Sequence, residues 1–106
     1  MPFDGTGFRQ EPPDDEVIQI LLRGREILEQ GWCQGAGRTR TGVCLAVSLH
    51  GASKYETYVK AHMLLLWAIK ETGFNHGGVS EFNDFPGRSK SEVLAVCDRA
   101  TELALS

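Results

Sequence analysis

Signals that start helices recur along this chain, and they constrain its fold more than any other feature. Ser53-Lys54-Tyr55-Glu56 and Ser89-Lys90-Ser91-Glu92 both match the capping box, in which a serine hydroxyl and a glutamate carboxylate bind each other's otherwise unpaired backbone amides. A third start follows Pro12-Pro13, where Asp14-Asp15-Glu16 places negative charge at the positive end of a helix dipole. The sequence therefore predicts three helix starts.

Each predicted start is followed by apolar residues at helical spacing. Gly31 and Gly73 are the expected stops of the first two helices, because glycine readily adopts the left-handed conformation that ends a helix. Gly24 costs roughly 1 kcal/mol relative to alanine inside the first helix, and either close approach of another helix or simple exposure accounts for it. The predicted apolar stripes are Val17, Ile18, Leu21, Leu22 and Leu28; Tyr55, Val59, His62, Met63, Leu66 and Ile69; and Val93, Val96, Cys97, Ala100 and Leu103.

Val43 to Leu49 is an ambiguous segment. Large and small apolar residues alternate along it, which is typical of a strand, but a short helix buried on all sides gives a similar pattern. There is no second convincing strand to pair with it, so a helix is favoured.

Residues 74 to 88 are rich in Gly, Asn and Asp and contain the turn pair Pro86-Gly87. The predicted fold class is all-α, a compact bundle of about four helices with a glycine-rich loop after the first helix.

The chain has 106 residues, enough for one hydrophobic core and too few for two. We expect a flexible N-terminal arm over residues 1–13, because Pro12-Pro13 blocks backward helix growth, and a single helical domain over residues 14–106. The sequence shows no export signal and no apolar run of membrane-spanning length.

The net charge and the cysteine content limit the classes of partner and the cell compartment that the sequence predicts. The formal net charge of -3 argues against nucleic acid and membrane surfaces. Cys33, Cys44 and Cys97 are odd in number and widely spaced, so they indicate neither a disulfide framework nor a zinc site, and a cytoplasmic location fits best. The three histidines share no metal-ligand spacing, and His62 is expected to be a hydrogen-bonded structural residue. Neither a metal nor a cofactor is predicted.

The stretch from Cys33 onward invites comparison with the phosphate-binding loop of protein tyrosine phosphatases, in which an arginine stands six residues after the cysteine. Here a threonine stands at that place, and Arg38 and Arg40 flank it, so the guanidinium that clamps phosphoryl oxygens is displaced. Gly37 and Gly42 have the glycine spacing of a nucleotide-binding P-loop, but the lysine and the Ser or Thr that should follow are missing. The sequence matches neither loop.

A second cluster combines aromatic residues with Asn83, Asp84 and Arg88 just before the last helix start. Structural roles are favoured over ligand contact. Asn and Asp bond backbone amides in turns, the aromatic residues plug the end of the bundle, and Asp84 can pair with Arg88. Trp32 is likewise expected to anchor the core, with its indole N–H bonded to a loop carbonyl.

Three features of these clusters point to a family. They are Gly31-Trp32-Cys33-Gln34-Gly35 after the first helix, the entry to the second at Gly42, Cys44 and Leu45, and Phe82-Asn83-Asp84 with Arg88 before Glu92-Val93-Leu94-Ala95. With these features the chain resembles a family of small uncharacterised bacterial and phage proteins, over roughly residues 15 to 104. The resemblance implies a helical fold and no known activity. It also leads us to expect Trp in place of Phe82, and the Arg-Thr-Arg loop is unusual for it.

The leading hypothesis is a non-enzymatic accessory domain that binds a partner protein or a small ligand, with the two clusters meeting at one end of the bundle. The runner-up is an enzyme that uses Cys33 as nucleophile on an anionic, phosphate-like substrate. A third alternative is a structural homodimerising bundle, which predicts an exposed apolar stripe on the first or third helix. No catalytic residue is assigned. The hypothetical ligand-binding residues are Trp32, Cys33, Gln34, Arg38, Arg40, Asn83, Asp84 and Arg88.

Overall fold

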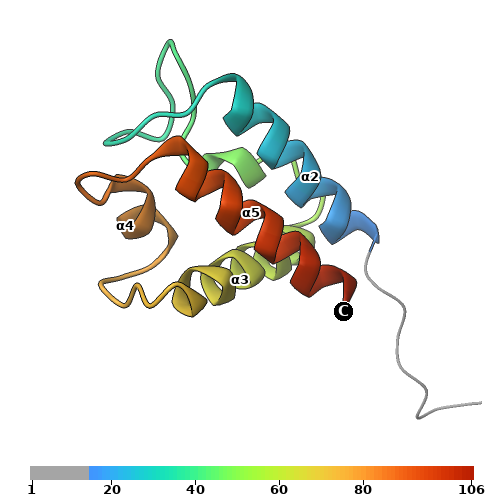
Figure 1. Ribbon diagram of the computed structural model, residues 1–106. Helices are drawn as coiled ribbons and strands as arrows, with labels where there is room; N and C mark the ends of the chain where they lie inside the picture. Colours follow the sequence, from blue (N-terminus) through green and yellow to red (C-terminus); the bar gives the residue numbers. More distant parts are fainter. Residues whose placement is uncertain (1–14) are drawn as a thin grey trace, which may run out of the picture.

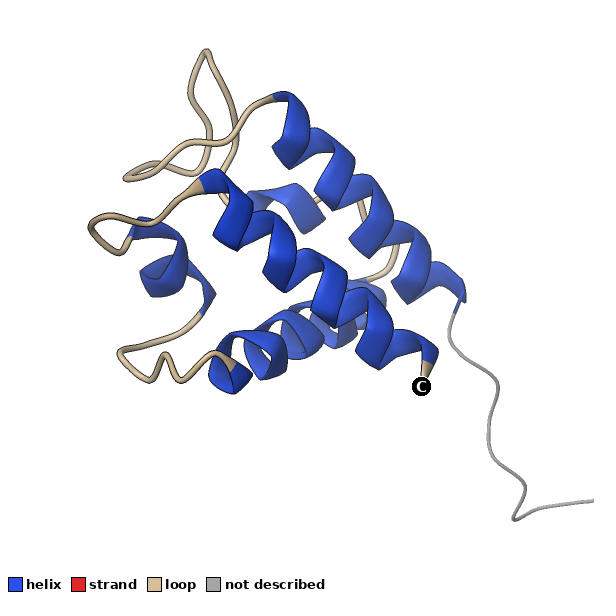
Figure 2. Cartoon of the chain, in the orientation of Figure 1, coloured by secondary structure: helices blue, strands red, loops and turns tan. Residues whose placement is uncertain are grey.

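The computed structural model describes residues 15–106, in which four α-helices and one short 3-10 helix form (Figure 1). In chain order these are α2 (Asp15–Gln30), η1 (Val47–Leu49), α3 (Tyr55–Glu71), α4 (Val79–Asp84) and α5 (Lys90–Leu105). No strand forms among the described residues, as the colouring of Figure 2 makes plain. The predicted all-α fold is confirmed. The predicted arm over residues 1–13 lies outside the described residues.

The long helices α2, α3 and α5 form the body of the molecule. α2 and α5 lie side by side, and α3 packs across both of them (Figure 1). η1 packs against α2, and α4 packs against α3. One apolar cluster fills the space between these elements, and its fully buried members include Leu21, Leu28, Leu65 and Val93. The loop after α2 and the segment around α4 lie together at one end of this bundle (Figure 1).

The predicted glycine stops and the second capping box are confirmed. The amide of Gly31 donates to the carbonyl oxygen of Ile27 at 3.1 Å, and Gly73 has a φ of +93° just after α3. The Ser89 hydroxyl accepts the amide of Glu92 at 3.2 Å, and the Glu92 carboxylate accepts the amide of Ser89 at 2.8 Å. α5 therefore begins with the reciprocal pair of bonds that its sequence predicts.

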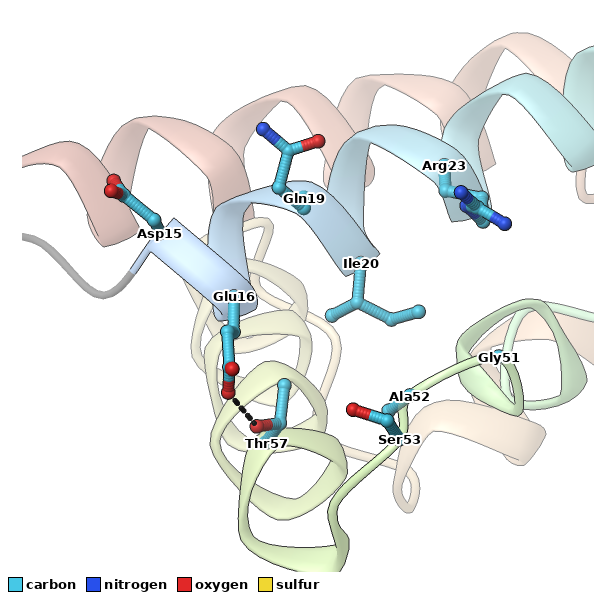
Figure 3. A pocket seen from close by; sticks show the side chains of 9 residues that line it. All are labelled: Asp15, Glu16, Gln19, Ile20, Arg23, Gly51, Ala52, Ser53 and Thr57. Carbon is cyan, nitrogen blue, oxygen red and sulfur yellow. Dashed lines mark hydrogen bonds between the residues drawn. The ribbon is translucent and has the colours of Figure 1, made fainter.

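α3 begins one residue late, and the predicted capping box at Ser53 is wrong. The residue before the helix is Lys54, which makes no side-chain cap and accepts the amide of Tyr58 with its carbonyl oxygen. The start of α3 is instead tied to α2, because Glu16 accepts the Thr57 hydroxyl at 3.2 Å and lies 3.4 Å from the Lys54 ammonium. Figure 3 shows Glu16 and Thr57 pointing toward one another across this junction.

Ser89→Ala should lower the free energy of unfolding by about 1 kcal/mol, because it removes the side-chain cap of α5. Ser53→Ala is the matched control: Ser53 is exposed and caps nothing, so its loss should stay within about 0.5 kcal/mol. Urea denaturation of both variants beside the parent chain measures the difference. Equal losses in the two variants would contradict this assignment of the caps.

The buried face of α3 differs from the predicted one. Tyr55 and Met63, two members of the predicted stripe, are 81% and 63% exposed, and Ile69 alone belongs to both faces. The prediction fails because it followed large side chains, whereas closely packed helices also bury alanine. The predicted stripe is a second apolar face that points largely outward. The residues that α3 does bury are Thr57, Ala61, Leu65, Ala68 and Ile69.

The segment from Val43 to Leu49 is mostly not the helix that the sequence favours. Val43 forms two isolated bridges, parallel to Trp32 and antiparallel to Arg38, and only Val47–Leu49 makes a 3-10 turn. The physical reason is that both backbone groups of Val43 are hydrogen-bonded to residues 31–33. The Val43 amide donates to the Gly31 carbonyl oxygen, and the Val43 carbonyl oxygen accepts the Cys33 amide, each at 3.1 Å. Helical bonding can start only beyond that point.

Gly24 marks a close approach between α2 and η1. A Cβ at this position would lie 3.1 Å from the carbonyl oxygen of Ser48, and Gly24 itself is buried. Of the two alternatives for this glycine, simple exposure is therefore wrong. The neighbour that comes close lies on the short 3-10 turn rather than on a full helix.

Candidate functional site

Asn83, on α4, is the centre of the contact between the two sequence clusters. Its side chain is completely buried. Its Oδ1 accepts the indole N–H of Trp32 at 2.7 Å and the amide of Leu45 at 2.9 Å. Its Nδ2 donates to the carbonyl oxygen of Cys33 at 3.0 Å and to Oδ1 of Asp84 at 2.9 Å. A carboxamide has two acceptor positions and two donors, so every one of them is used inside the protein.

Gln34 and Gly35 extend this contact along the end of α4. Gln34 Nε2 donates to the carbonyl oxygens of Asn83 at 3.0 Å and Phe85 at 3.1 Å, and the amide of Gly35 donates to Asp84 Oδ1 at 2.9 Å. A helix of six residues is too short to be stable alone, and its last carbonyls need partners. The loop after α2 supplies them. We refer to these bonds among Trp32, Cys33, Gln34, Gly35, Leu45, Asn83 and Asp84 as the Asn83 lock.

Arg88 is held by aromatic residues, and the predicted pairing with Asp84 is wrong. Its guanidinium carbon lies 3.7 Å from the centroid of the Phe82 ring, and its Nε donates to the Phe82 carbonyl oxygen at 2.8 Å. Its Nη1 lies 3.4 Å from a Glu92 carboxylate oxygen. Asp84 is engaged elsewhere, since one of its oxygens already accepts two bonds in the Asn83 lock. The predicted aromatic plug does form, with Phe74 edge-on to Phe82 at 5.4 Å and both rings buried.

Two predicted side-chain partners need correction. Trp32 does pack against the core, but its indole N–H binds the side chain of Asn83 rather than a loop carbonyl. His62 is predicted to be hydrogen-bonded, yet its Nδ1 is buried without a hydrogen-bond partner among residues 15–106. The His62 ring instead packs against Tyr58, with 5.8 Å between centroids. Neither partner could be chosen from local sequence, because both depend on tertiary packing.

Residues 37–44 form a small hairpin that projects from the lock (Figure 1, the teal to green loop beyond the end of α2). Two backbone bonds of 2.8 Å close it, from the Cys44 amide to Gly37 and from the Thr39 amide to Gly42. Arg38 and Arg40 are exposed on this hairpin, and neither side chain has a partner within the described part of the chain. They are the predicted site residues that the lock leaves to solvent.

The base of the loop brings two backbone segments into direct contact. Gly31 accepts the amide of Val43 at 3.1 Å, and Gly42 lies immediately beside this bond. A Cβ on Gly42 would stand 2.5 Å from the amide nitrogen of Trp32 and closer still to the backbone of Gly31. Only a residue without a side chain fits at this crossing.

Cys33 lies among hydrogen-bond acceptors. Its Sγ is 3.4 Å from the carbonyl oxygen of Ala36 and 3.6 Å from that of Gly42. A cysteine-based phosphate loop instead surrounds its sulfur with amide donors or cations, so this geometry does not support Cys33 as a nucleophile. Cys97, a member of the predicted apolar stripe of the last helix, is buried, and Cys44 is buried as well. Among residues 15–106, His, Cys, Asp and Glu side chains nowhere gather in a group of three that could hold a metal ion.

Alkylation should separate the thiols of the folded protein. Cys33 is half-buried, while burial raises the pKa of the Cys97 thiol to about 12 and so removes the reactive thiolate. With iodoacetamide at about pH 8, mass spectrometry should find Cys33 modified at least about tenfold faster than Cys97. In denaturant the two rates should converge. Equal rates in the folded protein would contradict the burial of Cys97.

Five cavities formed by residues 15–106 lie away from the hairpin. These open cavities have volumes of 300 to 400 Å³, and none is lined by residues 32–42. Arg88 is the one predicted ligand-binding residue found in their walls, in two of the five. Figure 3 shows a polar hollow of about 300 Å³ between the starts of α2 and α3. Its lining is Asp15, Glu16, Gln19, Ile20, Arg23, Gly51, Ala52, Ser53 and Thr57.

The outward face of α3 carries an exposed apolar stripe of the kind that a homodimerising bundle predicts for the first or third helix, but the sequence pattern did not single out Trp67 or the groove beside it. Trp67 is 59% exposed there and borders an apolar groove of about 400 Å³ between α3 and the end of α5. The available signal was that α3 carries large apolar residues on more sides than one core can bury. The groove is lined by Val17, Lys60, Met63, Leu64, Trp67, Leu103 and Ala104.

Among the comparisons with known proteins, only the one with family sequence models finds a match. Residues 12–103 match a family described as being of unknown function (DUF6197). No curated protein and no solved structure matches the chain. Within residues 15–106, no helix combines the length and the apolar character needed to cross a membrane.

Proposed function

The chain belongs to the family of unknown function DUF6197, and from its site geometry we propose that it is a non-enzymatic binding domain that presents the hairpin of residues 37–44 to an acidic segment of a partner protein. The observation that carries this proposal is that the polar side chains at one end of the bundle fall into two sets, one bonded inside the protein and one exposed. The side chains of Trp32, Gln34 and Asn83 bind within the lock. Arg38 and Arg40 project from it without a partner in the described residues.

The motifs that carry the family resemblance fit this division. Gly31 to Gly35 and Asn83-Asp84 supply most of the bonds of the lock. We therefore assign these motifs to folding and the hairpin to recognition. We also place the protein in a reducing compartment such as the cytoplasm, because Cys33, Cys44 and Cys97 are all free thiols.

Shape favours a partner protein over a small ligand. Small molecules bind in concave sites that bury most of their surface, and the five cavities described above have no residue of the hairpin in their walls. A projecting hairpin can instead enter a groove of a larger molecule. The lock fixes the base of the hairpin before binding, which reduces the entropy lost on association.

Chemistry favours carboxylates as the target. Arginine guanidinium groups bind carboxylates through two parallel hydrogen bonds, and Arg38 and Arg40 occur within three residues of one another. Thr39 and Thr41 lie between and beside them, with their hydroxyls 3.2 Å apart and open to solvent. The net charge of -3 repels an extended polyanion, whereas a short acidic segment meets only the local positive charge.

An NMR titration with a glutamate-rich peptide of about eight residues tests this function. Shifts of backbone amides should be confined to residues 36–42 and should weaken as salt is added. Arg38→Gln with Arg40→Gln should weaken binding at least about tenfold. Arg23→Gln is the matched control, because Arg23 is equally exposed but lies on α2.

A glutamine-rich peptide of the same length controls for charge and should cause no shift. Absence of any shift with the glutamate peptide, or shifts of equal size in the double variant, would overturn the proposal. Preferential binding of a short DNA duplex would overturn it in favour of a nucleic-acid partner.

A further inference from the structure

The outward face of α3 carries a ladder of large apolar side chains. Tyr55, Val59, Met63 and Trp67 follow one another at intervals of four residues and therefore line up along one side of the helix. Tyr55, Met63 and Trp67 are 81%, 63% and 59% exposed. Trp, Tyr and Met are the residues that protein interfaces favour, and monomers rarely expose them in a row.

The ladder continues into the apolar groove beside it. Met63 and Trp67 form one wall of this groove of about 400 Å³, and Leu103 and Ala104 of α5 form another. Covering the ladder and the groove together would remove from water the most exposed large apolar side chains of α3. One face of the molecule thus combines an exposed apolar ridge with an apolar groove, as the surfaces of protein–protein interfaces do.

We propose that this face binds a second copy of the chain, with the two α3 helices antiparallel about a two-fold axis near Met63. The charges on the face select this arrangement. In that register Met63 meets Met63, Val59 meets Trp67, and Glu56 meets Lys70 twice, once on each side of the axis. Glu56 has no partner among residues 15–106, and Lys70 makes only a 3.4 Å bond to the Gly77 carbonyl.

Other pairings satisfy the face less well. A parallel arrangement would set Glu56 against Glu56 and Lys70 against Lys70, and like charges face to face oppose association. α3 has 17 residues and is about 25 Å long, so the covered area lies at the low end of specific interfaces. The dimer should therefore dissociate at micromolar rather than nanomolar concentration.

Sedimentation equilibrium of the full chain, from about 1 to about 300 µM, tests the proposal. The mass should rise from 11.7 kDa toward twice that value. Met63→Glu should raise the dissociation constant at least about tenfold, because it sets two carboxylates against each other. Leu22→Glu, at an exposed apolar site on α2, should leave it unchanged.

A charge-swap experiment tests the register itself. Glu56→Lys and Lys70→Glu should each weaken the dimer, whereas an equimolar mixture of the two variants should regain it as a heterodimer, because each mixed contact again joins opposite charges. A mass of one chain at every concentration would overturn the proposal. The proposal would also be overturned if Met63→Glu left the dissociation constant unchanged, or if the mixture of the two charge variants dimerised no more strongly than each variant alone.

The same samples identify the other possible occupant of the face, residues 1–14 of the chain itself, which contain Phe3 and Phe8. If Phe3→Ser with Phe8→Ser shifts the indole N–H resonance of Trp67 while the mass stays at one chain, the face belongs to that segment and the dimer proposal is wrong. If the resonance moves only with protein concentration, the second copy is supported.

Discussion

Asn83→Ala is expected to lower the free energy of unfolding by about 3 to 5 kcal/mol. The substitution deletes four hydrogen bonds at once. It leaves the buried Leu45 amide and the partly buried Trp32 indole and Cys33 carbonyl without their partner. Each buried group left unpaired costs about 1 to 3 kcal/mol.

Urea denaturation measures this loss, with Asn75→Ala as the control because Asn75 is exposed. The control should change the free energy of unfolding by less than about 0.5 kcal/mol. Asn83→Asp separates packing from hydrogen bonding, because it keeps the shape but sets an oxygen against the Cys33 carbonyl and Asp84. It should be at least as damaging as the alanine variant. A loss below about 1 kcal/mol in either variant would contradict the central role of Asn83.

Gly42→Ala is the second substitution with a large expected effect. Its Cβ would stand 2.5 Å from the amide nitrogen of Trp32, and the atoms in the way belong to backbone that cannot turn aside like a side chain. The crossing of Gly31 and Gly42 must then open, which breaks the Val43 bond to Gly31 and shifts the base of the hairpin. We expect a loss of about 3 kcal/mol or more.

Gly51→Ala is the matched control. A Cβ on Gly51 would meet Ile20 at an ordinary distance of 3.5 Å, so the loss should be within about 0.5 kcal/mol. Thermal unfolding of the two variants, followed by circular dichroism, gives the comparison. A Gly42→Ala protein as stable as the control would show that the two loop arms do not touch as described.

The ends of the three long helices are the most predictable part of the fold, whereas α4 (Val79–Asp84) forms inside residues 74–88, where the sequence indicates turns. Acidic residues after Pro12-Pro13, glycines at 31 and 73 and the box at Ser89 act within one turn of the chain, so a single sequence reveals them. The box at Ser53 has the same pattern and fails. A contact from outside the segment, Glu16 of α2, decides where α3 begins.

Burial was less predictable than position. α3 has apolar residues on two sides, and periodicity alone cannot tell which side meets the core. Small Ala61 and Ala68 turn inward, while Met63 and Trp67 turn outward. If the second copy covers them, the misplaced stripe is the signature of an interface rather than an error of hydropathy.

The sequence singles out the two clusters as unusual, but it does not reveal the roles of their residues. Asn83 binds Trp32 and Cys33 across 50 or more residues of chain, and local patterns do not encode such pairs. Of the eight predicted ligand-binding residues, Arg38 and Arg40 are the two that the structure leaves exposed without side-chain partners in residues 15–106. Distinctive side chains of a loop can thus stabilise the loop itself, and we assign recognition of the partner to the exposed residues that the loop presents.

Native-state hydrogen exchange at the amide of Leu45 examines the lock without altering any residue. This amide lies outside every helix and has Asn83 Oδ1 as its partner at 2.9 Å. If the lock holds the loop against α4, the Leu45 amide should exchange only as fast as the core amides of α5, while the exposed Arg40 amide at the hairpin tip exchanges freely. Exchange of Leu45 at the rate of Arg40 would show a loop that opens on its own, and would contradict the account.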